Sequence, residues 1–181
     1  MLQGIEREPD ARNAYEVRTG NLVEQVGFCR HDVLLFNGSS YNRIEGGTST
    51  DTRISALDLH GAECNDNLFT DWVITGGPSV ATNGDGGPGN KVALRAGNTS
   101  HAQGDDNNVF MNCLVTNFEG NAMEALPRSS NTTFMNVHVK DTQCGLKVRS
   151  LATTGNVCDR TTVHGCVFVN LTTKVFDVDG T

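Results

Sequence analysis

The sequence has little of what nucleic-acid-binding, membrane-spanning or secreted proteins need. Aromatic residues make up 6% of the 181 positions, and the 14 Lys and Arg residues are outnumbered by 21 Asp and Glu residues. The resulting net charge of −7 argues against nucleic acid as a partner, because phosphate binding requires a basic surface. No apolar run has the length of a membrane span, and the first ten residues lack the apolar core of a signal peptide. We therefore expect that the chain does not insert into a membrane and that it is synthesised in a cytosol.

The six cysteines do not form a pattern that indicates disulfides or a metal site. The sequence contains no C-x-x-C pair, zinc-like spacing, phosphate loop or metalloprotease motif, so we expect no metal and no cofactor. Cys113 and Cys166 occupy the same column of a repeat, with Val137 between them. Stacked strands would hold them roughly 9–10 Å apart, whereas disulfide reach ends at about 7 Å between Cα atoms. We expect reduced cysteines that serve as small core residues.

What the sequence does have is a repeat that aligns with itself four times. Each copy reads apolar, any residue, Asn/Asp/Gly, apolar, any residue, apolar, and a weaker copy precedes them. A pattern that recurs every few dozen residues is typical of a stacked, quasi-one-dimensional fold. The first apolar residue of each copy defines column zero: Ile44, Phe69, Phe110, Phe134 and Val163.

The apolar phase of each copy slips by one residue two positions after column zero. Asp71, Asn112, Asn136 and Gly165 stand there. These residue types tolerate a left-handed backbone, so the slip predicts a sharp bend between two strands. After a polar stretch, each coil continues into a third expected strand, at 54–59, 91–96, 121–126, 145–148 and 174–178.

This pattern resembles the right-handed parallel β-helix of the pectate-lyase-like superfamily, which includes phage tailspikes, over roughly residues 40 to 178. The resemblance implies an all-β solenoid of about five to six short coils. The solenoid would span 31–181, with an N-terminal arm or cap at 1–30 and a Gly/Pro-rich loop inserted at 76–90. The resemblance also implies an asparagine ladder at the bend, with Asp71, Asn112 and Asn136 as its rungs. A left-handed β-helix is less favoured, because the sequence has no strict hexapeptide period.

The outer face of the expected strands is apolar where a solvated strand should be polar. An exposed apolar stripe marks an interface, although residues 1–30 offer an alternative cover. Because β-helices of the resembled kind commonly pack in threes on virions, we expect a homotrimer. The stripe consists of the outward positions one and four after column zero: Val73, Met111, Leu114, Met135, His138, His164 and Val167.

Candidate catalytic residues are few. Glycosidases need two carboxylates at a defined separation, and the best acid pair in the sequence is Glu119 with Glu124. We expect no arginine in register with this pair. Lys147 and Arg149, one coil away from Glu124, indicate a cross-strand ion pair on a solvated face instead. If the chain is an enzyme, Glu119 and Glu124 are its candidate catalytic residues.

These features favour a non-catalytic virion structural protein, by analogy with the resembled β-helices. We expect a small trimeric β-helix that acts as a phage capsid decoration (cement) protein or a short spike and contacts other virion proteins. It would be located in the virion after assembly in the host cytoplasm. The alternative is a carbohydrate-active β-helix protein: a polysaccharide lyase, or a glycan-binding tailspike or depolymerase that acts on a host surface glycan. The single Trp and the scarcity of outer aromatic platforms count against the alternative.

Overall fold

A computed structural model describes residues 34–36, 40–52, 55–59, 63–77, 92–97, 105–150 and 158–180. Every secondary-structure element in these ranges is a β-strand, and they contain no helix long and apolar enough to cross a membrane. By its internal contacts the chain divides into residues 1–31 and residues 32–181. The expected arm at 1–30 lies outside the described residues, as does most of the expected loop at 76–90.

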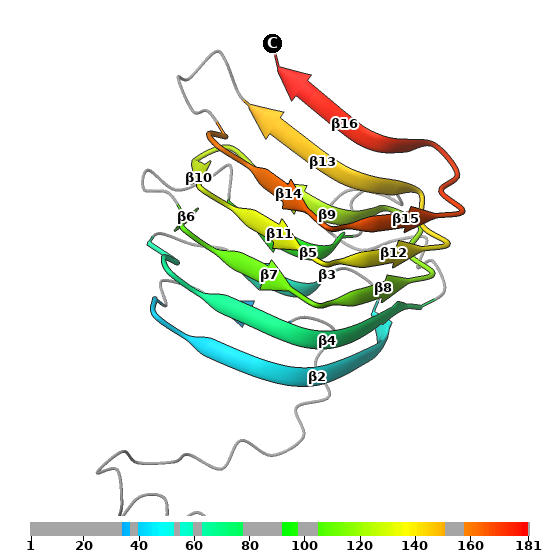
Figure 1. The fold of residues 1–181 in the computed structure, drawn as a ribbon, viewed down its shortest axis with the longest axis horizontal. Coiled ribbons are helices and arrows are strands. Elements are labelled where there is room, and N and C mark those ends of the chain that lie inside the picture. The colour runs from blue at the N-terminus through cyan, green and yellow to red at the C-terminus, as the bar shows by residue number, and fades with distance from the viewer. Residues whose placement is uncertain are drawn as a thin grey trace, which may run out of the picture. The chain divides into compact units, whose positions relative to one another are not determined.

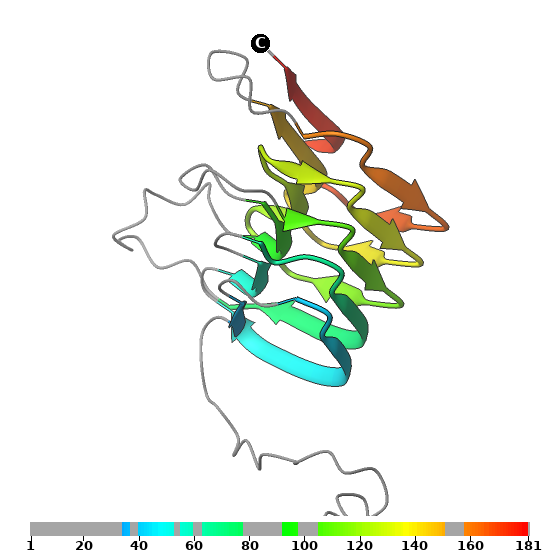
Figure 2. The same cartoon turned by 90° about the vertical axis from the view of Figure 1, so that its left-hand side faces the viewer.

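The strands stack into a parallel β-helix, as the coils in Figures 1 and 2 show from two sides. The pairings within the sheets are all parallel, so each strand lies beside the equivalent strand of the next coil. This confirms the predicted all-β solenoid. Sheet A contains the third strand of each coil, in the order β1 (Leu34–Phe36), β3 (Ser55–Leu59), β5 (Val92–Ala96), β9 (Asn121–Ala125), β13 (Cys144–Ser150) and β16 (Lys174–Gly180).

Sheet B contains the first two strands of each coil. In the two earliest coils these form one long bent strand, and in the later coils they separate at the bend. A small third sheet, β6 (Asp105–Asp106) with β10 (Ser129–Ser130), continues as a bridge from Ser130 to Asp159. The strands of sheet B are β2 (Arg43–Thr52), β4 (Leu68–Gly76), β7 (Val109–Met111), β8 (Leu114–Thr116), β11 (Thr133–Met135), β12 (His138–Lys140), β14 (Thr162–His164) and β15 (Val167–Val169).

The core is a set of identical columns that run along the stack. Phe69, Phe110 and Phe134 are in register on β4, β7 and β11 and are fully buried. Their rings stack with centroid separations of 5.4 and 5.3 Å. On sheet A the fully buried Leu94 and Met123 are in register and belong to the same core. Column zero of the repeat is therefore the aromatic spine of the fold.

The backbone bends where the apolar phase slips. The φ angle is 62° at Asp71, 54° at Asn112, 52° at Asn136 and 64° at Gly165. These values lie in the left-handed region that Asn, Asp and Gly tolerate best, which confirms the predicted single-residue bend. The same geometry recurs at two further corners, formed by Asp66, Asn107, Asn131 and Arg160 and by Asn117, Asp141 and Asn170.

Candidate functional site

Part of the expected apolar stripe forms one continuous column on the outer face of sheet B. Val73, Leu114, His138 and Val167 are in register on β4, β8, β12 and β15. The side chains of Val73, Leu114 and Val167 are 42%, 38% and 44% exposed, and His138 is exposed as well. A parallel sheet whose outer apolar column is exposed is unusual, because parallel sheets are normally covered on both faces.

The remaining stripe residues lie across the bend. Met111, Met135 and His164 are in register on β7, β11 and β14. His164 is exposed, whereas the two methionines are half-buried. A cavity of about 300 Å³ lies at the bend beside the column, lined by Asn112, Cys113, Leu114, Asn136 and His138. The outer face of sheet B therefore combines apolar side chains with a shallow depression that the two asparagines border.

The three expected ladder residues are joined by hydrogen bonds along this bend. Asn136 Nδ2 donates to Asn112 Oδ1 at 3.3 Å, and Asn112 Nδ2 donates to Asp71 Oδ1 at 3.2 Å. All three side chains are exposed. The ladder lies on the outer side of the bend, beside the apolar column. Its hydrogen bonds fix the path of the backbone there.

A second asparagine ladder is buried at Asn67 and Asn108 and half-buried at Asn42, and sequence reasoning missed it. Asn42 Nδ2 donates to Asn67 Oδ1 at 2.8 Å, and Asn67 Nδ2 donates to Asn108 Oδ1 at 3.0 Å. Asn108 Nδ2 in turn donates to the Cys64 carbonyl at 2.7 Å. The available signal was the Asn that opens two of the repeat copies, at positions 67 and 108. These buried amides satisfy one another at the corner between sheets, as buried polar groups must.

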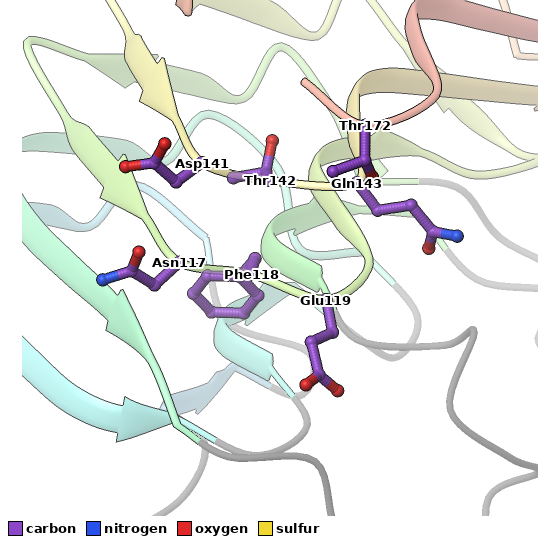
Figure 3. A pocket seen from close by; sticks show the side chains of 7 residues that line it. All are labelled: Asn117, Phe118, Glu119, Asp141, Thr142, Gln143 and Thr172. Carbon is purple, nitrogen blue, oxygen red and sulfur yellow. The ribbon is translucent and has the colours of Figure 1, made fainter. Parts of the chain in front are cut away.

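Glu119 lies at a groove of about 380 Å³ at the corner between the two sheets (Figure 3). Figure 3 shows Asn117 and Asp141 pointing to the same side, and Glu119 pointing away from them. Asp141 accepts a hydrogen bond from Asn170 Nδ2 and has a φ of 54°. Asp141 is therefore a turn residue in this groove. The groove is lined by Asn117, Phe118, Glu119, Asp141, Thr142, Gln143 and Thr172.

Glu124 lies in a different pocket, on the outer face of sheet A. Arg95 Nε donates to Glu124 Oε2 at 3.1 Å, and Arg95 Nη1 donates to Asp58 Oδ2 at 3.1 Å. The expectation that no arginine accompanies Glu124 in register was wrong, because Arg95 of β5 pairs directly with it. The expected solvated face was also wrong at this position, since Glu124 and Asp58 are buried. The sequence does not predict the register of β5, because an insertion precedes this strand.

Glu124 belongs to a column of alternating charge that crosses sheet A. Each member is in register with the next, and on β3, β5, β9 and β13 the strand neighbours belong to the core or pack against it. Opposite charges in directly opposed positions stabilise a sheet, and ion pairs form within this column from Arg95 to Asp58 and Glu124 and from Lys147 to Asp177. Its members are Asp58 on β3, Arg95 on β5, Glu124 on β9, Lys147 on β13 and Asp177 on β16.

At its C-terminal end this column borders a pocket of about 300 Å³. Lys147 Nζ lies 3.4 Å from Asp177 Oδ2, and Lys174 Nζ donates to Asp177 Oδ1 at 2.6 Å. The hydrogen bond from Lys174 lowers the pKa of the Asp177 carboxyl, so this carboxylate stays ionised to a lower pH than a free aspartate does. Three of the charged groups that line the pocket, Lys147, Lys174 and Asp177, therefore hold one another in place.

Comparisons of the chain with models of protein families, with curated proteins and with solved structures find no match. Within the described ranges, no group of three or more His, Cys, Asp or Glu side chains is placed to hold a metal ion. The cysteines in those ranges are free thiols, and burial raises the pKa of Cys113 to about 11. Function must therefore be inferred from the surfaces of the two sheets.

Proposed function

We propose that this chain is a non-catalytic structural protein of a virion, which assembles as a homotrimer through the apolar column on sheet B. The observation that carries the proposal is the in-register alignment of Val73, Leu114, His138 and Val167 on an exposed sheet face. Three rods packed side by side would bring this column of each chain toward a common axis. Such a closed arrangement uses the same surface on every copy and leaves none of it exposed.

The energetics favour a weak, concentration-dependent trimer. Full burial of Val73, Leu114 or Val167 would add roughly 1 kcal/mol each, because these side chains are already more than half covered. Each association step costs at least about 4 kcal/mol in lost translational and rotational freedom. The three aliphatic side chains of one copy, about 3 kcal/mol together, do not offset one such step by themselves. The half-buried Met111 and Met135, on the adjacent strands of the same face, would supply the remaining contact area.

The virion role rests on the resemblance of the repeat to the β-helices of phage tailspikes. A short, rigid rod with an apolar flank suits a capsid decoration or cement protein, or a short spike that contacts other virion proteins. The alternative role as a carbohydrate-active enzyme draws less support from the two glutamates. Glu119 and Glu124 line separate pockets, and Glu124 is held by Arg95, whereas glycoside hydrolysis needs two carboxylates facing one substrate.

The proposal is tested by the mass of the assembly. Light scattering of the wild-type chain at increasing concentration should approach three times the monomer mass of 19.4 kDa. The double variant Val73→Asp/Leu114→Asp should stay monomeric, because it places carboxylates in the buried column. The matched control Gln143→Glu/Thr172→Asp adds the same two charges at exposed positions off the column and should keep the wild-type mass. A monomeric wild type, or a double variant with the wild-type mass, would overturn the proposal.

A further inference from the structure

His138 is the one titratable member of the apolar column on sheet B. It lies on β12, in register with Leu114 on β8 and Val167 on β15, and its side chain is exposed. The proposed trimer would cover the whole column, so this imidazole would pass from water into contact with aliphatic side chains. An imidazole takes up a proton between about pH 8 and pH 5. The same column therefore provides both the contact surface and a group that becomes charged in mild acid.

The groups around His138 supply no negative charge to an imidazolium. Its in-register neighbours on both adjacent strands are aliphatic. The cavity of about 300 Å³ beside it is otherwise lined by Asn112, Asn136, Cys113 and Leu114. The amides are uncharged, and burial raises the pKa of the Cys113 thiol to about 11, so this thiol is neutral throughout the range in which an imidazole titrates.

The charged groups of the same face also favour a neutral His138. Lys140 lies two residues further on the outer side of β12, where it is exposed, and His164 is exposed across the bend on β14. Lysine, and in acid also histidine, would repel a second positive charge. The two carboxylates of this region already have partners. Asp141 lies 3.6 Å from Lys140 Nζ, and Asp71, at the bend of β4, accepts bonds from a ladder amide and a threonine hydroxyl.

We propose that His138 makes the proposed trimer pH-dependent, so that it forms at pH 8 and dissociates in mild acid; this switch exists only if the trimer does. In the trimer, contact with aliphatic side chains disfavours the charged imidazole, whereas in the separate chain water solvates it. The trimer therefore binds fewer protons than three separate chains. Association must weaken as the pH falls, because the state that binds more protons gains at low pH.

The direction of this effect separates it from the overall charge of the chain. The net charge of −7 at pH 7 decreases in magnitude as the pH approaches the isoelectric point of about 5.1. Repulsion between copies would then weaken, and association would become tighter. A trimer that dissociates on acidification therefore requires a specific group that gains charge inside the contact. His138 fits this requirement by its position in the column.

Light scattering of the full chain over a concentration series at pH 8 and at pH 5.5 tests the switch. The association constant of the wild-type trimer should fall at least about 100-fold between these values, because each trimer that dissociates takes up as many as three protons. The concentration for half assembly then rises about tenfold, since it varies with the inverse square root of that constant. His138→Leu should keep the trimer at both pH values, because it makes the column wholly aliphatic.

The matched control His164→Leu makes the same change on the same face, across the bend from the column. It should still lose the trimer at pH 5.5. Circular dichroism of each variant at both pH values separates dissociation of the trimer from acid unfolding of the chain. A His164→Leu trimer that no longer responds to pH would assign the switch to the wrong histidine and overturn the inference.

The remaining outcomes separate the switch from the trimer itself. A wild type that is trimeric with the same association constant at both pH values would overturn the switch and leave the proposed trimer intact. A His138→Leu variant that dissociates in acid as the wild type does would also overturn the switch. A wild type that is monomeric at pH 8 would overturn the trimer, and the switch with it.

Discussion

The middle coils and the last coil share the same columns but not the same burial. In the middle coils, the inward side chains of Phe134 and Leu146 are almost completely buried. In the last coil, formed by β14, β15 and β16, the equivalent Val163 is half-buried and Phe176 is 52% exposed. Val178, also inward, is 71% exposed. A solenoid coil is covered only by its two neighbours. An inward side chain in this fold is therefore fully buried only where its coil has a neighbour on each side.

The exposed asparagine ladder also differs between the middle coils and the last coil. Asn136 donates along the exposed ladder to Asn112, but the next position toward the C-terminus is Gly165, which has no side chain to continue it. The backbone keeps its left-handed bend there, with a φ of 64°. The last coil therefore retains the local geometry of the repeat at this bend but lacks the ladder amide there, although Asn170 and Asp177 still bond to the preceding coil. The left-handed bend of the backbone at this position therefore forms without the side-chain hydrogen bond of the ladder.

The largest effect we predict is a difference between two phenylalanines of equivalent inward orientation. Phe110→Ala removes the central ring of the aromatic spine and should lower the free energy of unfolding by about 3–5 kcal/mol. Phe176→Ala removes a ring that is already half in water, and should cost less than about 1.5 kcal/mol. Urea denaturation followed by circular dichroism measures both values. Equal losses would mean that the last coil is covered as completely as the middle ones.

A smaller effect is expected where the ladder stops at Gly165. Gly165→Ala forces a left-handed conformation on alanine and should cost about 1–2 kcal/mol. The new Cβ would also clash with Asn136 Oδ1, so that amide must move. Gly165→Asn should cost less than Gly165→Ala, because asparagine tolerates this backbone and can bond to the ladder. Thermal unfolding of the two variants in parallel measures the difference, and an asparagine variant weaker than the alanine variant would contradict it.

The columns and the bend were predictable from the sequence, because both depend on local residue types. Asn112 and Asn136 permit the left-handed turn, and the apolar residues around them fix which side faces inward. The partner of Glu124 was not predictable in this way. Arg95 reaches it only because β5 stacks below β9, and the register of β5 follows an insertion whose path the sequence does not specify. Side-chain contacts between neighbouring coils depend on the register of their paired strands. Contacts within one coil depend on the spacing of residues along the sequence.

The buried ladder shows the same limit. Asn67 and Asn108 begin equivalent repeat copies, but nothing in their spacing distinguishes an inward amide from a solvated one. The charged pocket combines both difficulties, because Lys147 and Arg149 come from one coil, and Lys174 and Asp177 from the next. The sequence therefore predicts the scaffold better than the side chains that its stacking brings together.

The smallest effect concerns two cysteines in equivalent positions, and it requires no substitution. Cys113 precedes Leu114 on a middle coil, and Cys166 precedes the in-register Val167 on the last coil. Burial raises the pKa of both thiols, to about 11 at Cys113, which is buried, whereas Cys166 is only half-buried. Because the thiolate is the reactive form, Cys113 should react slowly at pH 8 and about tenfold faster per pH unit up to its pKa.

Mass-spectrometric mapping of alkylation over time measures both rates in the same sample. Cys166 should be modified first at pH 8, because it lies in the less covered coil and a reagent reaches it without opening the stack. If Cys113 were modified first, the middle coils would open more readily than the last one, and the comparison of the two regions would be reversed. Adding urea below the unfolding midpoint should speed modification of Cys113 more than that of Cys166, because only Cys113 depends on separating two fully packed coils.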